Sequence, residues 1–145
     1  MISKLQKVYL AGFLDGDGSI YVRVRPNSDY RFGFQVEPHI VFFQSAKNQK
    51  SFTRLCALLP YGKMRERKDG ILEYMINRIE DIRNFLQDVG PYILLKHKQV
   101  SLMRKIVEKK FKVKTKKDFQ ELLDLIAGFD SLNYSKKRKQ RSIYP

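Results

Sequence analysis

Two aspartates separated by one glycine end the apolar stretch from Leu10 to Ile20, which reads LAGFLDGDGSI. Carboxylate oxygens are ligands for divalent cations, and Mg²⁺ usually takes one or two of them together with phosphate oxygens of a substrate. A calcium loop of the EF-hand type is excluded, because Ile20 stands where that pattern requires glycine and Pro26 where it requires glutamate. The stretch is neither a Walker A loop nor a GxGxxG fingerprint. A single Asp17 carboxylate would make a poor metal site, so a second one has to come from elsewhere.

Gly12 and Gly16 lie four residues apart in this stretch, on one stripe of a predicted helix. Each glycine in a helix interior costs about 1 kcal/mol relative to alanine, but the missing side chains let a second backbone come close. The natural partner is the same helix of a second copy, packed about a two-fold axis. A crossing with another helix of the same chain is the alternative. The residues expected to line the seam between two copies are Val8, Ala11, Gly12 and Asp15.

Two such helices running in parallel would bring both Asp17 side chains together at one end of the seam. Two Asp17 carboxylates, the Gly16 carbonyls and the phosphates of a substrate supply enough oxygen ligands for a divalent metal. The spacing of the motif therefore predicts a homodimer whose seam ends in a metal site.

The charge balance indicates a partner rich in phosphate. The 145 residues hold 29 Lys and Arg against 15 Asp and Glu, a net charge of +14, which is typical of proteins that bind nucleic acid. A ribosomal-type structural protein and a membrane-surface protein are the alternatives on charge alone. Cys56 is the single cysteine, which excludes an intramolecular disulfide and a cysteine-based zinc site. No apolar run approaches the roughly 20 residues of a membrane span, and we expect no signal peptide at the N-terminus.

Hydrophobic periodicity predicts the elements that position these groups. Helices are expected over residues 5–16, 46–59, 80–89, 95–109 and 118–132. Strands are expected in SIYVRVRP and YRFGFQVEPHIVFFQ, with a turn at PNSD between them, and in a hairpin that turns at KDG. The order is an αββ unit that occurs twice, which predicts a two-layer α+β domain with helices on one face of a four-stranded sheet. We expect this domain to span residues 1–134, with residues 135–145 as a basic tail.

The other face of the predicted sheet has no element to cover it, and arginine dominates its side chains. Solvated faces usually mix Glu and Lys, whereas arginine suits bidentate contacts with guanine edges and phosphates. We expect this face to read DNA, and ordinary exposure of one face of a sheet is the alternative. The residues expected to contact DNA are Tyr21, Arg23, Arg25, Asn27, Arg31, Gln35, Glu37, Lys63, Arg65, Arg67, Glu73 and Met75, together with Lys136 in the tail.

The segment LAGFLDGDGSI resembles, nearly letter for letter, the signature of the LAGLIDADG homing endonucleases. The single motif, the chain length and the αββαββα order resemble the homodimeric branch of that family, which group I introns encode. The resemblance continues through YVRVRPNSDY, FFQ, PYILLKHKQ and LNYSKKRK, so it covers nearly the whole chain. It implies a LAGLIDADG endonuclease fold whose four-stranded antiparallel sheet binds DNA.

The same resemblance implies roles for individual residues. Asp17 matches the metal-binding aspartate at the foot of the motif helix, and the Gly16 carbonyl completes that metal site. Gln44 matches a polar residue that positions solvent near the scissile phosphate, and Lys96 matches an active-site lysine near the same phosphate. A further basic residue is expected a turn after Gln44. Because QSAKNQKSF holds one extra residue, both Lys47 and Lys50 are candidates for it.

Residues and resemblance together predict a site-specific endonuclease that cleaves double-stranded DNA as a homodimer, by Mg²⁺-dependent phosphodiester hydrolysis. A strand of about 9 residues spans about 30 Å, or roughly 9 base pairs, so a pseudo-palindromic target near 20 base pairs is expected. The alternatives are an intron maturase or a DNA-binding regulator on the same scaffold, and a monomeric ribosomal-type RNA-binding protein. We expect neither a membrane nor a small-molecule substrate as partner. We expect an intracellular location, in the chloroplast or mitochondrion whose genome carries the intron.

Overall fold

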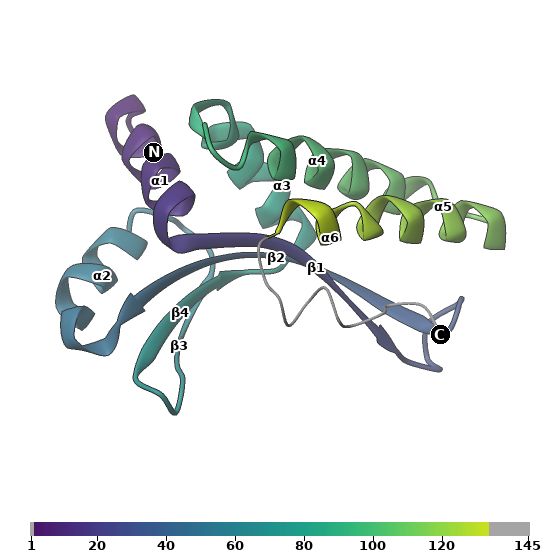
Figure 1. Cartoon of the computed structure of the whole chain (residues 1–145), viewed down its shortest axis with the longest axis horizontal. Coiled ribbons are helices and arrows are strands. Elements are labelled where there is room, and N and C mark those ends of the chain that lie inside the picture. Colours follow the sequence, from purple (N-terminus) through teal and green to yellow (C-terminus); the bar gives the residue numbers. More distant parts are fainter. Residues whose placement is uncertain (1, 134–145) are drawn as a thin grey trace.

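The computed structural model describes residues 2–133, which form a two-layer α+β domain with helices on one face of an antiparallel sheet (Figure 1). Its first helix, α1 (Lys4–Asp17), begins at Ser3. The Ser3 hydroxyl accepts the backbone N–H of Gln6, and the Gln6 side chain accepts the backbone N–H of Ser3. This reciprocal cap satisfies two N–H groups that a helix start otherwise leaves unpaired. The cap fixes where α1 begins, and the helix runs without interruption to Asp17.

The sheet contains four strands in the order β1-β2-β4-β3, and all neighbouring pairs are antiparallel. Strand β1 (Gly18–Pro26) follows α1 directly and pairs with β2 (Phe34–Ser45). Strands β3 (Lys63–Glu66) and β4 (Ile71–Ile76) form the second hairpin. Gly70 closes its turn at φ 81°, in the left-handed region that glycine occupies without strain. The predicted four-stranded antiparallel sheet and its α+β class are therefore confirmed.

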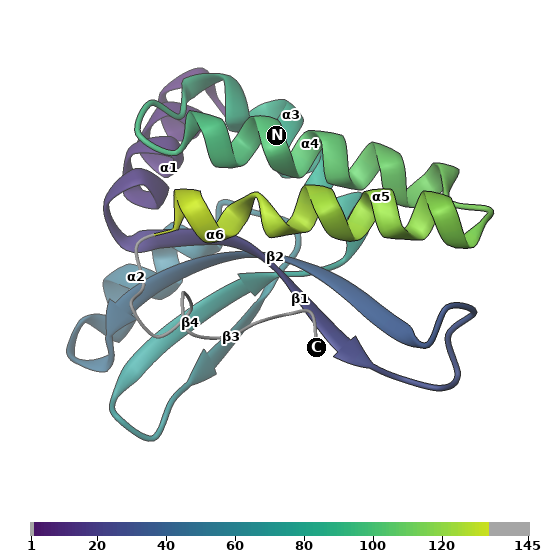
Figure 2. The ribbon, with the colours of Figure 1, turned by 45° about the vertical axis from the view of Figure 1, so that its right-hand side comes forward.

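Most of the remaining helices lie over the sheet beside α1, and the helix that follows β2 lies at the end of the sheet (Figure 2). A 3₁₀ turn, η1 (Ala46–Asn48), leads into α2 (Gln49–Cys56), and α3 (Ile79–Asp88) is followed by a second 3₁₀ turn, η2 (Gly90–Tyr92). The chain continues through α4 (His97–Lys112), α5 (Lys116–Ala127) and α6 (Phe129–Leu132). Within residues 2–133, no helix has the length and apolar character that crossing a bilayer requires.

The predicted helix over residues 118–132 differs from the observed structure at both ends. Thr115 caps α5, because its hydroxyl accepts the N–H of Asp118 while the Asp118 carboxylate accepts the N–H of Thr115. Asp118 is therefore the third residue of the helix rather than its first. Gly128 then separates α5 from the short α6.

The core lies between the helices and one face of the sheet. Phe42 of β2 is 1% exposed, and its ring packs against those of Phe13, Tyr74 and Phe85 at centroid distances of 5.8, 6.4 and 5.9 Å. Aromatic rings at these separations stabilise a core beyond the area they bury. The contacts join α1, α3 and the two central strands into one unit, which holds the end of α1 against the sheet.

Strand register places the other set of side chains on the face without helices. The buried pair Ile20 and Ile40 faces the helices, so neighbouring residues along each strand point the other way. The two hairpins bend away from the helices, so this second face lies inside an arch (Figure 1). We call it the open face. Its residues include Tyr21, Arg23, Arg25, Gln35, Glu37, His39, Val41, Lys63, Arg65, Glu73 and Met75.

Candidate functional site

Asp17 is the last residue of α1, and both it and Gly16 are exposed. The last four carbonyls of a helix have no partner within that helix, and the macrodipole makes this end negative. The last turn of α1 has no basic residue. Among residues 2–133, no side chain or backbone N–H pairs with the Asp17 carboxylate. A free carboxylate at a negative helix end favours a bound cation, so Asp17 and the Gly16 carbonyl fit the expected divalent metal.

Asp15, two residues earlier, has both carboxylate oxygens occupied within its own chain. Its Oδ2 accepts the N–H of Leu94 at 2.9 Å, and its Oδ1 accepts the N–H of Lys96 at 3.0 Å. Lys96 Nζ in turn donates to the Asp15 carbonyl at 2.8 Å. These three hydrogen bonds tie the segment before α4 to the end of α1. They bring Lys96 beside the helix turn that carries Asp17.

Gln44 lies at the same end of the sheet. Gly18 pairs with Phe42, so Gln44 extends two residues past the start of β1, level with the end of α1. Its Oε1 accepts the N–H of Ser45 at 2.8 Å and the Asn48 amide at 3.4 Å. The Gln44 NH₂ group donates to no acceptor among residues 2–133, so within that range it is available as a donor. Asp17, Gln44 and Lys96 therefore gather at one end of the molecule.

The two candidates for a further basic residue lie beyond Gln44. Lys47 belongs to η1 and Lys50 to α2, and both are exposed. No group of three or more His, Cys, Asp and Glu side chains within residues 2–133 could hold a metal. One copy of the chain therefore offers Asp17 as a single carboxylate, which agrees with a site shared between two copies.

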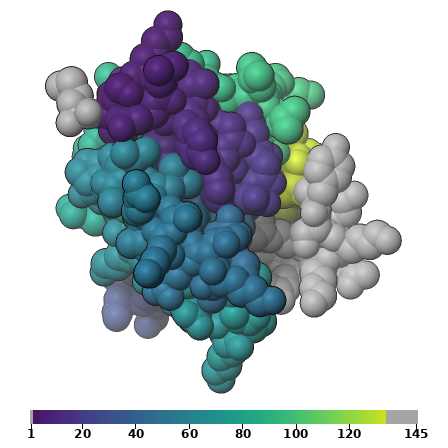
Figure 3. All heavy atoms as spheres, turned by 90° about the vertical axis from the view of Figure 1, so that its left-hand side faces the viewer, coloured from purple at the N-terminus to yellow at the C-terminus, as the bar shows by residue number. Residues whose placement is uncertain are grey.

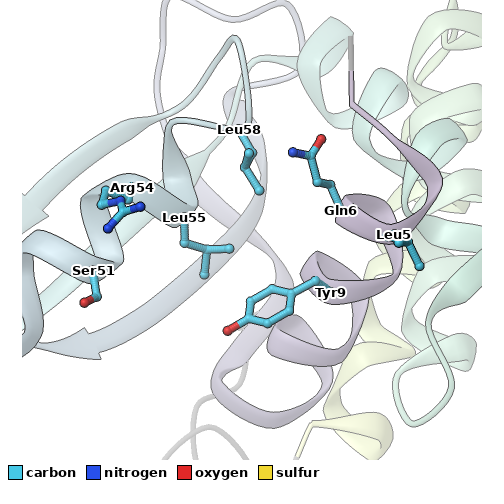
Figure 4. A pocket seen from close by; sticks show the side chains of 7 residues that line it. All are labelled: Leu5, Gln6, Tyr9, Ser51, Arg54, Leu55 and Leu58. Atoms are coloured by element: carbon cyan, nitrogen blue, oxygen red, sulfur yellow. The ribbon is translucent and has the colours of Figure 1, made fainter.

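Helix α1 lies at the surface of the molecule (Figure 3), and its exposed side chains include the apolar residues Leu5, Val8 and Tyr9. Outside the backbone of α1 itself, a Cβ added at Gly12 or Gly16 would meet no atom of residues 2–133 within 4 Å, so packing within this part of the chain does not require glycine at either position. Leu5 is 81% exposed and Tyr9 is 64% exposed. A groove lined by residues of α1, α2 and the following turn continues this surface (Figure 4), and its lining is Leu5, Gln6, Tyr9, Ser51, Arg54, Leu55 and Leu58.

Two of the four residues expected to line the seam are corrected by the structure. Ala11 is 0% exposed, because it faces the core beneath α1 and not the outer surface. Asp15 is held by the backbone of residues 94–96, so its carboxylate serves the chain internally. Val8, which is 44% exposed, and Gly12 lie on the outer surface as expected. Leu94 and Leu95 are exposed apolar residues that the sequence did not single out.

On the open face, each carboxylate is paired with arginine. Glu73 accepts a hydrogen bond from Arg65 Nη2 at 2.8 Å, and Arg67 Nε lies 3.9 Å from the same oxygen. Glu37 accepts one from Arg25 Nη2 at 2.6 Å. Register sets Arg23 opposite Glu37, Arg25 opposite Gln35, Lys63 opposite Met75 and Arg65 opposite Glu73, with Tyr21 nearer the end of α1.

The other predicted contacts lie beside the open face or away from it. Arg67 is in the turn of the second hairpin and pairs with Asp69 at 2.6 Å. Asn27 is in the turn after β1, where its side chain accepts the N–H of Asp29. Arg31 is not on a strand as expected, because the turn extends to Gly33 and its guanidinium stacks over the Phe32 ring at 5.1 Å. Lys136 lies outside the described residues.

His39 is a buried residue of the open face that was not among the predicted DNA contacts. It is 3% exposed, stacks on Tyr21 at a centroid distance of 4.9 Å, and has Nδ1 3.2 Å from Met75 Sδ. Burial and the nearby Arg23 lower the pKa of His39, and Glu37 only partly opposes this. The alternation that places Tyr21 on this face also places His39 opposite it. That alternation is the sequence pattern from which the position of His39 on this face could have been predicted.

Residues 10–103 match the model of the family described as LAGLIDADG endonuclease. The chain belongs to the LAGLIDADG endonuclease family. Among its curated relatives is DNA endonuclease I-CreI of Chlamydomonas reinhardtii, which is 34% identical over 136 residues, or 93% of this chain and 83% of the relative. DNA endonuclease I-CvuI of Chlorella vulgaris is 28% identical over 97% of this chain and 85% of that protein.

Solved structures of LAGLIDADG proteins share the fold. I-CvuI in complex with the I-CreI target, crystallised with 2 mM Mg and with its DNA not cleaved, superposes with a TM-score of 0.88 over 97% of this chain and 87% of that one. The archaeal intron-encoded homing endonuclease I-Vdi141I, complexed with DNA, gives a TM-score of 0.81 at 19% identity, covering 94% and 89% of the two chains. This LAGLIDADG chain therefore spans most of the length of the proteins it resembles.

Proposed function

We propose that this protein is a site-specific DNA endonuclease that cleaves both strands of its target as a homodimer. The observation that carries the proposal is the end of α1, where Asp17 has no partner among residues 2–133 and Asp15, two residues earlier, holds Lys96 through its carboxylate and its carbonyl. Membership of the LAGLIDADG endonuclease family and relatives described as DNA endonucleases support the same activity.

The dimer is supported by the outer surface of α1. Glycine weakens a helix, and no neighbour within the described residues would exclude a side chain at Gly12 or Gly16. A second α1 packed across these positions would explain why both are glycine, since small residues allow two helix backbones to approach closely. The two-fold arrangement brings two Asp17 carboxylates together and makes the site complete only in the dimer.

We propose that the metal site uses the Asp17 carboxylates and Gly16 carbonyls of both copies, and that Mg²⁺ is the ion. A divalent metal bound there would supply a Lewis acid that activates water and stabilises the leaving 3′ oxygen. Lys96 would place its positive charge near the scissile phosphate, because the Asp15 carbonyl anchors its ammonium group. Gln44 would donate from its free NH₂ group to water or phosphate, because its carbonyl is held by Ser45 and Asn48.

The open face supplies sequence recognition in this proposal. It combines arginines with a lysine and a glutamine along the two hairpins, and the arch can follow the major groove of a duplex. Each copy would read one half of a pseudo-palindromic target, because a two-fold dimer presents the same surface twice. We also propose that the protein works inside the cell, in the chloroplast or mitochondrion whose genome carries its gene.

The test is a selection of cleaved sites from a randomised duplex library, in buffer with Mg²⁺ and in buffer with a chelator. We expect a pseudo-palindromic consensus of about 20 base pairs to be cleaved only when Mg²⁺ is present. Selection of a bound consensus with no cleavage under any divalent ion would instead favour a binding protein, such as a maturase or a regulator. Cleavage without sequence preference would contradict the role of the open face.

A further inference from the structure

One carboxylate on the open face holds two of the side chains expected to read DNA. Glu37 Oε1 accepts hydrogen bonds from Arg25 Nη2 and from Gln35 Nε2, each at 2.6 Å. Its second oxygen, Oε2, lies 3.5 Å from Nε2 of the buried His39. The Glu37 side chain is 20% exposed and that of Arg25 is 52% exposed. The carboxylate therefore lies low in the face, and the guanidinium projects further out.

The hydrogen bonds to Glu37 affect how this surface approaches phosphates. A free carboxylate there would repel DNA, but hydrogen bonds from Arg25 and Gln35 offset its charge. Long polar side chains lose rotamer freedom when they bind, and groups already held in position lose less of it. Glu37 holds both side chains before any base is present.

The strand register places this cluster far from the end of α1. Arg25 is seven residues along β1 from Gly18, a separation of about 23 Å at the usual rise of a strand. At about 3.4 Å per base pair, this equals roughly 7 base pairs along a duplex. The second carboxylate cluster, Arg65 with Glu73, lies near the Asp17 end, because Glu73 pairs with Phe43 and Gly18 pairs with Phe42. The two clusters therefore face different parts of a half-site.

The inference rests on the proposed function and adds to it. We propose that Glu37 is a positioning residue for sequence readout, which orients Arg25 and Gln35 toward the outer base pairs of each half-site. Arg25 keeps guanidinium N–H groups that are not committed to Glu37 and that match the O6 and N7 acceptors of guanine. Gln35 donates one N–H to Glu37 and keeps its carbonyl oxygen and second N–H, the pair of groups that matches adenine. The outer part of the half-site therefore contains guanine and adenine at the positions that these two residues face.

Binding-site selection from a randomised duplex, in metal-free buffer, tests this role without relying on cleavage. We expect Glu37→Ala to reduce the preference for the selected outer bases by about tenfold, with inner positions unchanged. Glu37→Gln keeps a carbonyl acceptor and should retain part of the preference. Glu66→Ala is the matched control, because Glu66 lies on β3 of the same sheet, pairs with Leu72 in register on the helix side, and has no charged partner among residues 2–133.

A double-mutant cycle with Arg25→Ala separates positioning from direct contact. If Glu37 acts through Arg25 at the base that Arg25 faces, the loss of preference at that base should be the same in the double variant as in Arg25→Ala alone, while the base that Gln35 faces still responds to the loss of Glu37. Additive losses, or an unchanged selection profile in both Glu37→Ala and Glu37→Gln, would overturn the inference while leaving the proposed endonuclease intact. A wild-type protein that selects no sequence at all would instead overturn the proposed function on which the inference rests.

Discussion

Replacing Gly12 tests whether α1 packs against a second copy of itself. In the part of the chain that the structure describes, a methyl group at Gly12 meets no neighbouring group within 4 Å, so Gly12→Ala should stabilise the isolated protomer by about 1 kcal/mol through helix propensity. For a domain of this size, that gain raises the melting temperature by roughly 3 °C. In the dimer, the same methyl group enters a close contact between two backbones, and overpacking costs about 1–3 kcal/mol.

The effect of Gly12→Ala should therefore change sign with protein concentration. In dilute solution, where protomers are separate, the variant should melt above the wild type. At concentrations where the wild type is dimeric, the variant should dissociate more readily, with a dimer dissociation constant roughly 5- to 150-fold weaker.

Sedimentation equilibrium over a range of concentrations measures the dimer dissociation constant. Thermal melts at the lowest and highest protein concentrations show whether Gly12→Ala raises or lowers the melting temperature. Gly12→Leu should give a folded monomer that neither binds a specific site nor cleaves. Lys105→Leu, on an exposed position of α4, is the control for adding an apolar side chain. A Gly12→Leu protein that keeps the mass of a dimer would refute the two-fold seam.

Three further outcomes follow from the charges of the protein. Arg65→Ala should cost about 1–3 kcal/mol in binding to the selected target, measured by titration against target and random duplexes; equal weakening on both would make Arg65 a phosphate contact. Deleting residues 135–145, which include the basic run KKRKQR, should flatten the dependence of binding on salt, since fewer counterions are released; an unchanged slope would mean that the tail does not contact DNA. Because burial lowers the pKa of His39 below the unfolded value of about 6.5, the unfolded chain binds this proton first as the pH falls. The free energy of unfolding, from urea titrations at pH 8 and pH 5, should therefore fall more in the wild type than in His39→Gln; equal losses would contradict a buried neutral His39.

The order of elements and the two faces of the sheet could be predicted from sequence because both depend on local periodicity. Alternation in β1 and β2 placed Tyr21, Arg23, Gln35 and Glu37 on one face, and the register confirms that placement. The end of α1 could also be predicted from the sequence. Its aspartates are the polar side chains of the last two turns, and its glycines lie at a fixed spacing of four residues.

The features that could not be predicted from the sequence depend mainly on how distant segments pack against each other. The hydrogen bonds from residues 94–96 to Asp15 join positions about 80 residues apart, so no local pattern distinguishes Asp15 from a seam residue. Ala11 was misplaced because α1 is apolar on nearly every side, and the burial of one stripe is decided by packing on the sheet. Arg31 was misplaced because Gly33, at φ 81°, extends the turn and delays the start of β2.

The central claim is that Asp17 carries the metal that cleavage requires, and Asp17→Asn tests it most directly. The substitution is nearly isosteric, keeps the outer surface of α1, and removes one negative charge from each copy. Cleavage of the selected target in Mg²⁺ and binding in metal-free buffer are measured side by side, with Asp130→Asn on α6 as the control for loss of a carboxylate elsewhere. The Lewis acid contributes several kcal/mol to such a reaction, so cleavage should fall by several orders of magnitude, while affinity holds or rises as repulsion of the phosphates is relieved. Cleavage near the wild-type rate, or a loss of binding together with cleavage, would contradict the account.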